Sequence, residues 1–284
     1  MKIRAFAKIN LALDVVSERD DGYHELKMIM APITLHDLIT IEVTDKPGII
    51  LTTNSSRVPT DERNIMYKVA QAVMEKYKIT KGIKMYCMKH IPSQAGLAGG
   101  SADGAAVIKA MNRLFKLHMS YEDMVELTKD IGSDIPFCIY NRLAVVSGKG
   151  EQFEFIHSSF NTNFLLVKPS RGVSTKRSFN ALDMSTALHP DIYKMKAALI
   201  HEDYQGVVDT LGNTLEEPSI DFVPGIATNK KEMLELGFDG ALISGSGSCV
   251  FGMTNDEEIL HKGYKYFKES YYFVRTTKLL SHQD

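Results

Sequence analysis

The chain of 284 residues lacks several features that define whole classes of protein. Its three cysteines, Cys87, Cys138 and Cys249, are far apart and odd in number, which excludes a disulfide framework and indicates a reducing compartment. No apolar run approaches the roughly 18 residues that cross a bilayer. The nine histidines form no H-x-H or H-x-x-x-H pair, and none neighbours a cysteine, so a structural zinc site is disfavoured.

The chain also lacks a strong excess of charge. The formal net charge is −2 and the isoelectric point is near 6.5, which gives no electrostatic case for binding nucleic acid. The first residues carry Lys2, Arg4 and Lys8 in an alternating pattern, without the apolar core of a signal peptide. We therefore expect a cytoplasmic protein that binds neither nucleic acid nor membrane.

The composition is that of an ordinary globular protein, with 44% hydrophobic and 24% charged residues. A length of about 150 residues per domain predicts two domains, and the second half begins near residue 155. Strand and helix patterns occur in mixed order, which favours an α+β fold over a doubly wound sheet. Strands are predicted at 3–15, 25–33, 38–44, 83–87, 143–146, 164–167 and 271–276, and helices at 61–77, 120–130, 191–200 and 203–214.

The stretch from Pro92 to Ala102 is the most informative part of the chain. It is rich in glycine, follows the apolar alternation of 83–87 and precedes a helical pattern with Val107 and Met111 on one face. A strand that leads through a glycine-rich loop into a helix offers free N–H groups to an anion, and phosphate is the usual ligand. The glycines match neither a Walker A loop nor a dinucleotide fingerprint. A tight turn that packs the helix against the strand is the alternative.

Four other features are candidates for chemistry: Lys8 with Asn10 on the polar face of the first strand, the loop 22–25, Asp134, and the Gly/Ser loop 244–248. Each has a commonplace structural explanation. These are a solvated lysine, a surface loop, a carboxylate that caps a turn, and a tight hairpin. Asp134 lies between a helix end and an apolar stretch, where a partly dry site tunes a general base.

Together these features match one pattern in order along nearly the whole chain. Residues 7–11, 92–102, 132–137 and 244–247 resemble the GHMP kinase superfamily, which includes galactokinase, homoserine kinase, mevalonate kinase and phosphomevalonate kinase. The resemblance implies a two-domain fold. A ribosomal-protein-S5-like domain would span 1–155, a ferredoxin-like domain would span 156–284, and the active site would lie between them. It also implies ATP and Mg²⁺ as cofactors.

Within the superfamily, residues 7–10, 21–25 and 96–101 are similar to the branch that phosphorylates a cytidine diphosphate-linked methylerythritol. That resemblance implies transfer of the γ-phosphoryl group of ATP to the 2-hydroxyl of this small-molecule substrate, in the non-mevalonate route to isoprenoid precursors. Another GHMP kinase, acting on a different small alcohol, remains an alternative. A nucleotide-binding homologue without catalysis is a second one. The chain is expected to be a monomer or a homodimer.

The same resemblance assigns roles to single residues. Asp134 matches the catalytic base, and Lys8 matches the lysine that stabilises the base and the transferring phosphoryl group. Ser101 is also a candidate ligand of Mg²⁺. The nucleotide positions are Asn64, Lys89, Pro92, Gly96, Leu97, Ala98, Gly99, Gly100 and Ser101. The positions for the second substrate are Asn10, Tyr23, His24, Thr175 and Phe179.

Four positions depart from the family pattern. Ala102 stands where a second serine is usual, and Gly104 stands where alanine is usual. Asn141 and Arg142 replace a common pair of glycines. Lys8 and Asp134 are both retained, so the departures bear on nucleotide affinity and substrate choice rather than on the fold.

Overall fold

The computed structural model describes residues 1–280 and divides the chain into two compact units. The first unit comprises residues 1–7, 35–91 and 98–141, and the second comprises the other described residues. Strands β1 (Lys2–Glu18) and β2 (His24–Thr44) contribute residues to both units. The predicted boundary at residue 155 stays a prediction, and residues 281–284 of the second predicted domain lie outside the described residues.

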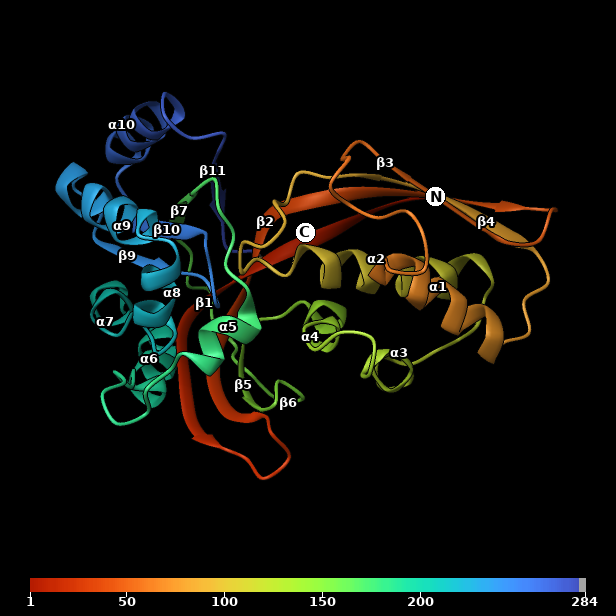
Figure 1. Cartoon of the computed structure of the whole chain (residues 1–284), viewed down its shortest axis with the longest axis horizontal. Coiled ribbons are helices and arrows are strands. Elements are labelled where there is room, and N and C mark those ends of the chain that lie inside the picture. Colours follow the sequence, from red (N-terminus) through yellow and green to blue (C-terminus); the bar gives the residue numbers. More distant parts are fainter. Residues whose placement is uncertain (281–284) are drawn as a thin grey trace. The chain divides into compact units, whose positions relative to one another are not determined.

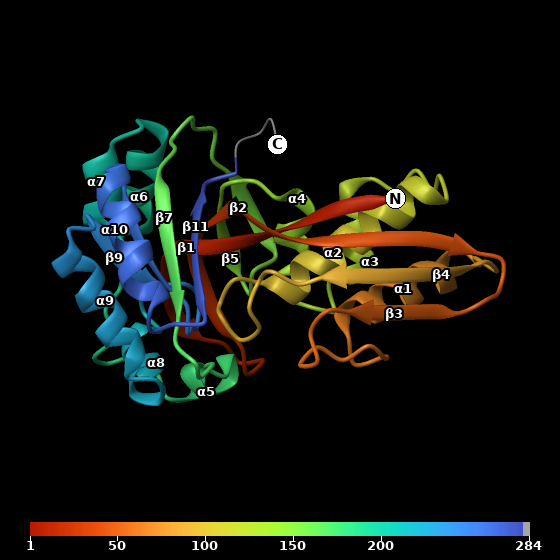
Figure 2. The same cartoon turned by 90° about the horizontal axis from the view of Figure 1, so that it is seen from above.

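The first unit adds strands β3 (Ile49–Thr53) and β4 (Gly82–Met88) and helices α1 (Ile65–Lys76), α2 (Gly99–Leu114), α3 (Tyr121–Thr128) and α4 (Ile135–Tyr140). Its part of β2 runs antiparallel to β4, and β3 runs parallel to β4. Both α1 and α4 pack against α2. In Figures 1 and 2 the helices of this unit lie on one side of its strands. The loop that precedes Ser101 therefore leads directly into the central helix of the unit.

Gly104 is the position at which α1 and α2 approach closely. A Cβ atom added to Gly104 would lie 2.7 Å from Ile65 Cγ2 and 3.3 Å from Val69 Cγ2. A larger residue would therefore fit here only if the Ile65 side chain shifted. The departure from the usual alanine therefore has a packing reason: Ile65 fills the space that a methyl group would take.

We expect Gly104→Ala to lower the free energy of unfolding by about 1–2 kcal/mol, since the cost of overpacking exceeds the gain in helix propensity. Thermal or urea unfolding measures the change. In an Ile65→Ala background the same substitution should become neutral or stabilising, because its steric partner is gone. An equal loss in both backgrounds would contradict the packing explanation.

The second unit contains a four-stranded antiparallel sheet in the order β11-β7-β10-β9. Helices separate β7 from β9 and β10 from β11, which is the βαββαβ arrangement expected for a ferredoxin-like domain. The strands are β5 (Ala144–Gly148), β6 (Gln152–Phe155), β7 (Asn163–Lys168), β8 (Gly212–Asn213), β9 (Gly240–Ile243), β10 (Val250–Thr254) and β11 (Phe273–Lys278). The helices are α5 (Thr175–Asn180), α6 (Ile192–Ile200), α7 (Tyr204–Asp209), α8 (Glu216–Phe222), α9 (Gly225–Leu236) and α10 (Glu257–Lys268).

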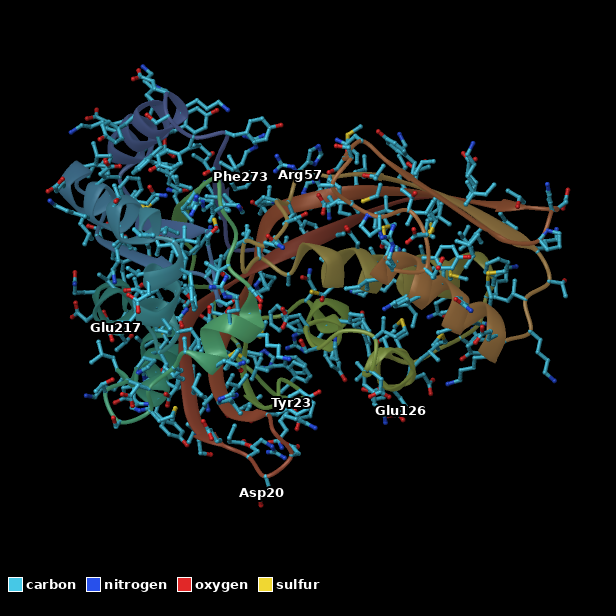
Figure 3. The ribbon with its side chains drawn as sticks, viewed as in Figure 1. Asp20, Tyr23, Arg57, Glu126, Glu217 and Phe273 are labelled. Atoms are coloured by element: carbon cyan, nitrogen blue, oxygen red, sulfur yellow. The ribbon has the colours of Figure 1, made fainter. Side chains whose placement is uncertain are left out.

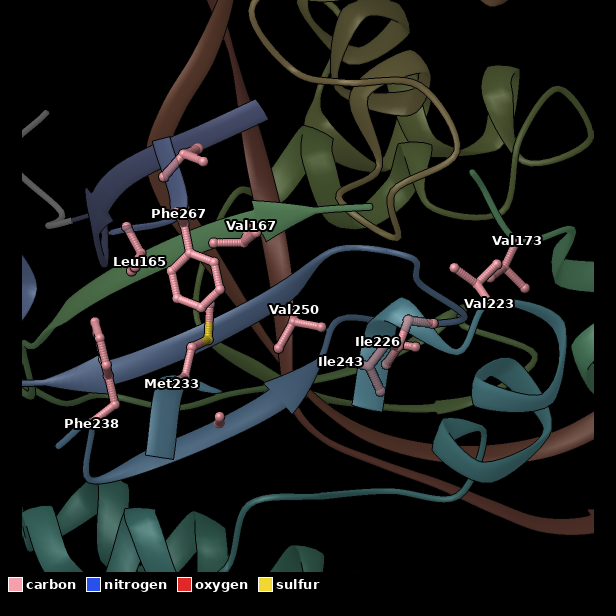
Figure 4. Packing of buried hydrophobic residues seen from close by; sticks show 12 residues of the cluster. Leu165, Val167, Val173, Val223, Ile226, Met233, Phe238, Ile243, Val250 and Phe267 are labelled. Carbon is pink, nitrogen blue, oxygen red and sulfur yellow. The ribbon is translucent and has the colours of Figure 1, made fainter. Parts of the chain in front are cut away.

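The core of the second unit lies between this sheet and helices α9 and α10. Leu165 and Val167 of β7 and Val250 of β10 face Met233 and Phe267 from the two helices, all of them buried (Figure 4). Burial of such side chains contributes about 1.5–3 kcal/mol each. The sheet is therefore a rigid support for the loops that leave its strands, including residues 244–249 between β9 and β10.

Most predicted elements are confirmed, and two predicted boundaries are wrong. The helices at 61–77, 120–130 and 191–200 correspond to α1, α3 and α6, with shorter ends. The strands predicted at 25–33 and 38–44 form the single strand β2, because the intervening Asp37 is buried with its charge compensated. The helix predicted at 203–214 ends at Asp209, and Gly212–Asn213 pairs instead with β1.

Membrane insertion is not indicated by the helices. Within residues 1–280, none combines the length and the hydropathy that a bilayer crossing requires.

Candidate functional site

The predicted site residues belong to both units. In the first unit, α2 begins at Gly99 after Ala98, which adopts a left-handed conformation with φ 55°. Ala98 has no side-chain oxygen, so the N–H groups of the first turn, from Gly99 to Ser101, lack the usual acceptor at the N-cap position. The strand–loop–helix prediction is confirmed, and the helix start has the geometry of an anion site.

Asp134 lies at the N-cap position of α4, but its side chain makes no capping hydrogen bond. The half-buried carboxylate is therefore not explained as a helix cap. Two residues earlier, a Cβ atom on Gly132 would lie 3.6 Å from Ser101 Oγ. The turn that presents Asp134 thus packs against the first turn of α2, and the structure brings Ser101 and the segment 132–134 together.

Lys89 lies at the end of β4 and is nearly buried. Its Nζ forms ion pairs with Asp37 of β2 and with Asp103 of α2, the latter at 2.5 Å. Burial lowers the pKa of Lys89, but the charges of Asp103 and Asp37 outweigh burial and raise this pKa above its ordinary value. Burial raises the pKa of Asp103, and the neighbouring Lys89 opposes that rise. Two carboxylates thus pair with the ammonium, and its predicted contact with nucleotide stays a prediction.

Asp37 is a site-building residue that the sequence analysis missed. Its carboxylate accepts hydrogen bonds from the backbone N–H groups of His90 and Ile91, and it also pairs with Lys89. These contacts fix the start of the segment that leads into the glycine-rich loop. The available signal was a single carboxylate within the largely apolar stretch 28–41, since a buried charge must be paired.

Asn64 serves the start of α1. Its Oδ1 accepts from the N–H of Met66 at 2.8 Å, and its Nδ2 donates to the carbonyl of Pro59 at 2.6 Å. Both ends of the amide are therefore occupied locally. Its predicted contact with nucleotide stays a prediction.

In the second unit, Lys8 and Asn10 lie side by side on β1, as the alternation predicts. Lys8 Nζ donates to Asn10 Oδ1 at 2.6 Å, and the backbone N–H of Lys8 donates to the carbonyl of Leu97 at 3.2 Å. Lys8 is 5% exposed and Asn10 is fully buried. The explanation of Lys8 as a solvated strand residue is therefore wrong. A lysine is buried so completely only where a partner or a function compensates the charge.

The two glycine-rich loops of the sequence contact each other within this unit. Gly96 has φ 73°, and a Cβ atom there would lie 1.7 Å from the carbonyl oxygen of Ser244. Ser244 Oγ in turn donates to the carbonyl of Gly96 at 2.9 Å. The backbone N–H of Cys249 donates to the carbonyl of Ala95. The loop 244–248 is thus a support for the segment 92–97 and not only a hairpin turn.

His24 and Phe179, predicted to act together, are neighbours. Their ring centroids lie 4.8 Å apart with an interplanar angle of 36°. Tyr23 is 61% exposed, and Lys149 Nζ lies 5.0 Å from the centroid of its ring. Figure 3 shows Tyr23 near the hairpin that joins β1 to β2. The structure therefore brings two of the three predicted aromatic contacts together.

Of the other predicted residues, Thr175 begins helix α5, and Pro92 and Leu97 lie in the segment 92–97. Thr175 Oγ1 is 2.9 Å from Ser246 Oγ of the loop 244–248. Leu97 is buried, so its side chain anchors the segment 92–97, and Pro92 is half-buried. The roles assigned to these residues stay predictions.

The family comparison covers most of these elements. The GHMP kinases N terminal domain matches residues 64–142, and the GHMP kinases C terminal domain matches residues 195–272. The first range contains Asn64, Lys89 and Asp134 and the whole of the glycine-rich loop. The second contains the loop 244–248.

Curated relatives match over almost the whole length. The chain is 39% identical over 276 residues to the 4-diphosphocytidyl-2-C-methyl-D-erythritol kinase of Bacillus cereus (strain B4264), covering 96% of both chains. The corresponding kinase of Bacillus cytotoxicus is 39% identical with the same coverage.

Solved structures give the same result. A crystal structure of 4-(cytidine 5'-diphospho)-2C-methyl-D-erythritol kinase matches with a TM-score of 0.84 and 26% identity, covering 99% of this chain and 100% of that one. The homoserine kinase of Cytophaga hutchinsonii matches with a TM-score of 0.75 and 20% identity, covering 97% and 94%. The latter likeness concerns the fold.

Proposed function

This chain belongs to the GHMP kinases, and on that premise we propose that it transfers the γ-phosphoryl group of ATP to the 2-hydroxyl of 4-diphosphocytidyl-2-C-methyl-D-erythritol. The chain is an ATP-dependent kinase with a small-molecule substrate. The observation that carries the choice of substrate is 39% identity over 96% of the chain to curated kinases of that name. The proposed step belongs to the non-mevalonate route to isoprenoid precursors, with a cytoplasmic location.

The start of α2 is the proposed binding site for the ATP phosphates. The N–H groups from Gly99 to Ser101 lack a side-chain cap, and the helix dipole adds a partial positive charge there. Gly96, held against Ser244, keeps the preceding backbone in a conformation that other residues rarely adopt. In this proposal the side chains of Lys89 and Asn64 are further contacts of the nucleotide.

Mg²⁺ is proposed to arrive with ATP. Within residues 1–280 there is no group of three or more His, Cys, Asp or Glu side chains arranged to hold a metal ion. This fits Mg²⁺, which commonly keeps waters and binds through phosphate oxygens with few protein ligands. The hydroxyl of Ser101 is the protein oxygen proposed to contact it. When bound, the ion would neutralise charge on the phosphates.

Asp134 and Lys8 are the proposed catalytic pair. The carboxylate of Asp134, which makes no capping hydrogen bond, would accept the proton of the substrate hydroxyl as the phosphoryl group is transferred. The buried ammonium of Lys8 would stabilise negative charge on the base and on the phosphoryl group. Asn10, which accepts from Lys8, would hold the lysine in place and orient the substrate.

The cytosine base is proposed to bind at the ring pair His24–Phe179. An aromatic face offers stacking, worth about 1–3 kcal/mol per base in nucleic-acid binders. Stacking does not distinguish bases, so discrimination requires hydrogen bonds to the base edge, which the His24 imidazole can donate and accept. Tyr23 and Thr175 are proposed as further contacts.

We expect Phe179→Ala to raise KM for the cytidylyl substrate about 5- to 100-fold and to leave KM for ATP unchanged, since it removes a stacking face. His24→Ala should raise the same KM and also weaken the preference for cytidine over uridine. Steady-state kinetics with ATP, the cytidylyl substrate and its uridine analogue measure these changes. Tyr272→Ala, which removes a fully exposed ring, is the matched control and should change neither KM. A raised KM for ATP alone would assign these rings to the nucleotide instead.

The experiment that tests the proposed function is a coupled assay of ADP release. The panel contains 4-diphosphocytidyl-2-C-methyl-D-erythritol, mevalonate, phosphomevalonate, homoserine and galactose. Turnover with the first compound alone is the expected result. Turnover with another alcohol would overturn the choice of substrate, and ATP binding without any turnover would overturn the kinase activity.

A further inference from the structure

Helix α5, which carries Phe179, has almost no hydrophobic anchor. It is six residues long, and a helix this short has no stability of its own. Of its residues, Ser178 alone is buried. Contacts outside the helix must therefore hold α5. The Arg177 guanidinium lies 4.3 Å from the centroid of the Phe222 ring of α8, and Ser178 is the buried residue of the helix that can make a hydrogen bond.

The hydroxyl of Ser178 begins a chain of hydrogen bonds. Ser178 Oγ lies 3.0 Å from Ser219 Oγ of α8, and both side chains are fully buried. Ser219 Oγ donates to the carbonyl oxygen of Ser246 at 3.0 Å. A hydroxyl has one proton to donate and a carbonyl only accepts. Ser219 therefore donates its proton to the carbonyl of Ser246, and Ser178 must be the donor to Ser219.

A second contact joins α5 to the same residue. Thr175 lies three residues before Ser178, so the two side chains share one face of the helix. Thr175 Oγ1 is 2.9 Å from Ser246 Oγ. Ser246 thus contacts α5 directly through Thr175 and indirectly through Ser219, which bonds to Ser178. These two contacts along one turn fix the rotation of the helix about its axis.

We infer that Ser178 and Ser219 are positioning residues for the second substrate: their hydroxyl chain sets the rotation of α5 and thereby the place of the Phe179 ring. The inference rests on the proposed function, in which this ring stacks on the cytosine base. Phe179 follows Ser178 directly, and its ring meets His24 at 4.8 Å between centroids. A helix turns by 100° per residue. Phe179 therefore lies about 100° round the helix axis from Ser178, and rotation of α5 about that axis moves the ring away from His24.

The anchor is directional, which an apolar contact is not. A buried serine pair holds its geometry because each oxygen loses a partner if the helix rotates, and an unpaired buried hydroxyl is costly. The chain of hydrogen bonds ends on the loop 244–248, in which Ser244 Oγ donates to the carbonyl of Gly96. One loop of the second unit therefore supports both the segment 92–97 and the helix that carries Phe179.

The test compares Ser178→Ala and Ser219→Ala with the native chain. Loss of one such hydrogen bond should raise KM for the cytidylyl substrate about 3- to 10-fold, with KM for ATP and kcat unchanged. The double variant should be no worse than the more impaired single variant, because both remove the same chain. In a Phe179→Ala background, Ser178→Ala should add no further rise in KM. A role in stability alone would not produce this dependence on the ring.

Ser174→Ala is the matched control. Ser174 precedes α5, is exposed and makes no capping hydrogen bond with its side chain, so its removal should change neither KM. Thermal unfolding checks that each variant is folded. If Phe179→Ala raises KM and Ser178→Ala does not, the positioning role is wrong and the proposed function stands. If Ser178→Ala raises KM equally with and without the Phe179 ring, the positioning role is also wrong. If the native chain does not turn over the cytidylyl substrate, the proposed function fails first.

Discussion

Asp134→Asn should lower kcat about 10²- to 10⁴-fold while leaving the fold intact, because an amide cannot accept the proton of the substrate hydroxyl. The side chain of Asp134 makes no capping hydrogen bond to α4, so the substitution breaks no hydrogen bond at the start of that helix. Steady-state kinetics and circular dichroism on the same preparation measure both parts of the prediction.

The control is Asp130→Asn, an exposed carboxylate four residues earlier in the same segment, which should leave kcat unchanged. Lys8→Met should also abolish most turnover, and the unbranched apolar side chain of methionine keeps much of the buried stem of the lysine. A near-normal kcat in Asp134→Asn would remove this residue from the mechanism. A near-normal kcat in Lys8→Met would do the same for the lysine.

Gly96→Ala should be the most damaging single-methyl change in the glycine-rich segment. The new Cβ would lie 1.7 Å from the carbonyl oxygen of Ser244, and φ is 73°. The left-handed conformation costs about 1–2 kcal/mol and overpacking costs about 1–3 kcal/mol, so we expect a loss of about 2–5 kcal/mol in unfolding free energy. Affinity for a non-hydrolysable ATP analogue should fall with it, as the loops 92–97 and 244–248 separate.

Gly48→Ala separates the two causes. Gly48 has φ 119°, but a Cβ there would have nothing within 4 Å, so this variant has a strained backbone without a collision. We expect a loss of about 1–2 kcal/mol and unchanged nucleotide affinity. Urea unfolding and calorimetry measure the pair. Equal losses in the two variants would show that contact with Ser244 contributes nothing.

The local features of the fold were predictable because they depend on neighbouring residues. Ser120 and Asp123 form the capping box that starts α3. The apolar stripe Met66, Val69 and Val73 is buried along α1, as its spacing predicts. The single strand β2 was not predictable, because Asp37 is tolerated inside it only through partners 52 to 54 residues away in the chain.

The candidate site was predictable residue by residue, but not contact by contact. The resemblance named Gly96, Lys8 and Phe179 from motifs of a few residues each. It did not show why residue 96 must be glycine. The reason is that the carbonyl of Ser244, which lies 148 residues later, leaves no space for a side chain there. Ser178 and Ser219 were not named at all, since a serine in a short helix has no distinctive pattern.

The sequence by itself determined the family, the order of most helices and strands, and the residue types available for phosphoryl transfer. These depend on composition, periodicity and short motifs, which are written in consecutive residues. The tertiary structure decided which polar groups are buried and what compensates them: Lys8 by Asn10, Lys89 by two aspartates, and Ser178 by Ser219. The reason is physical. The cost of burying a polar group depends on the partners that folding brings to it, and several of these partners are distant in sequence.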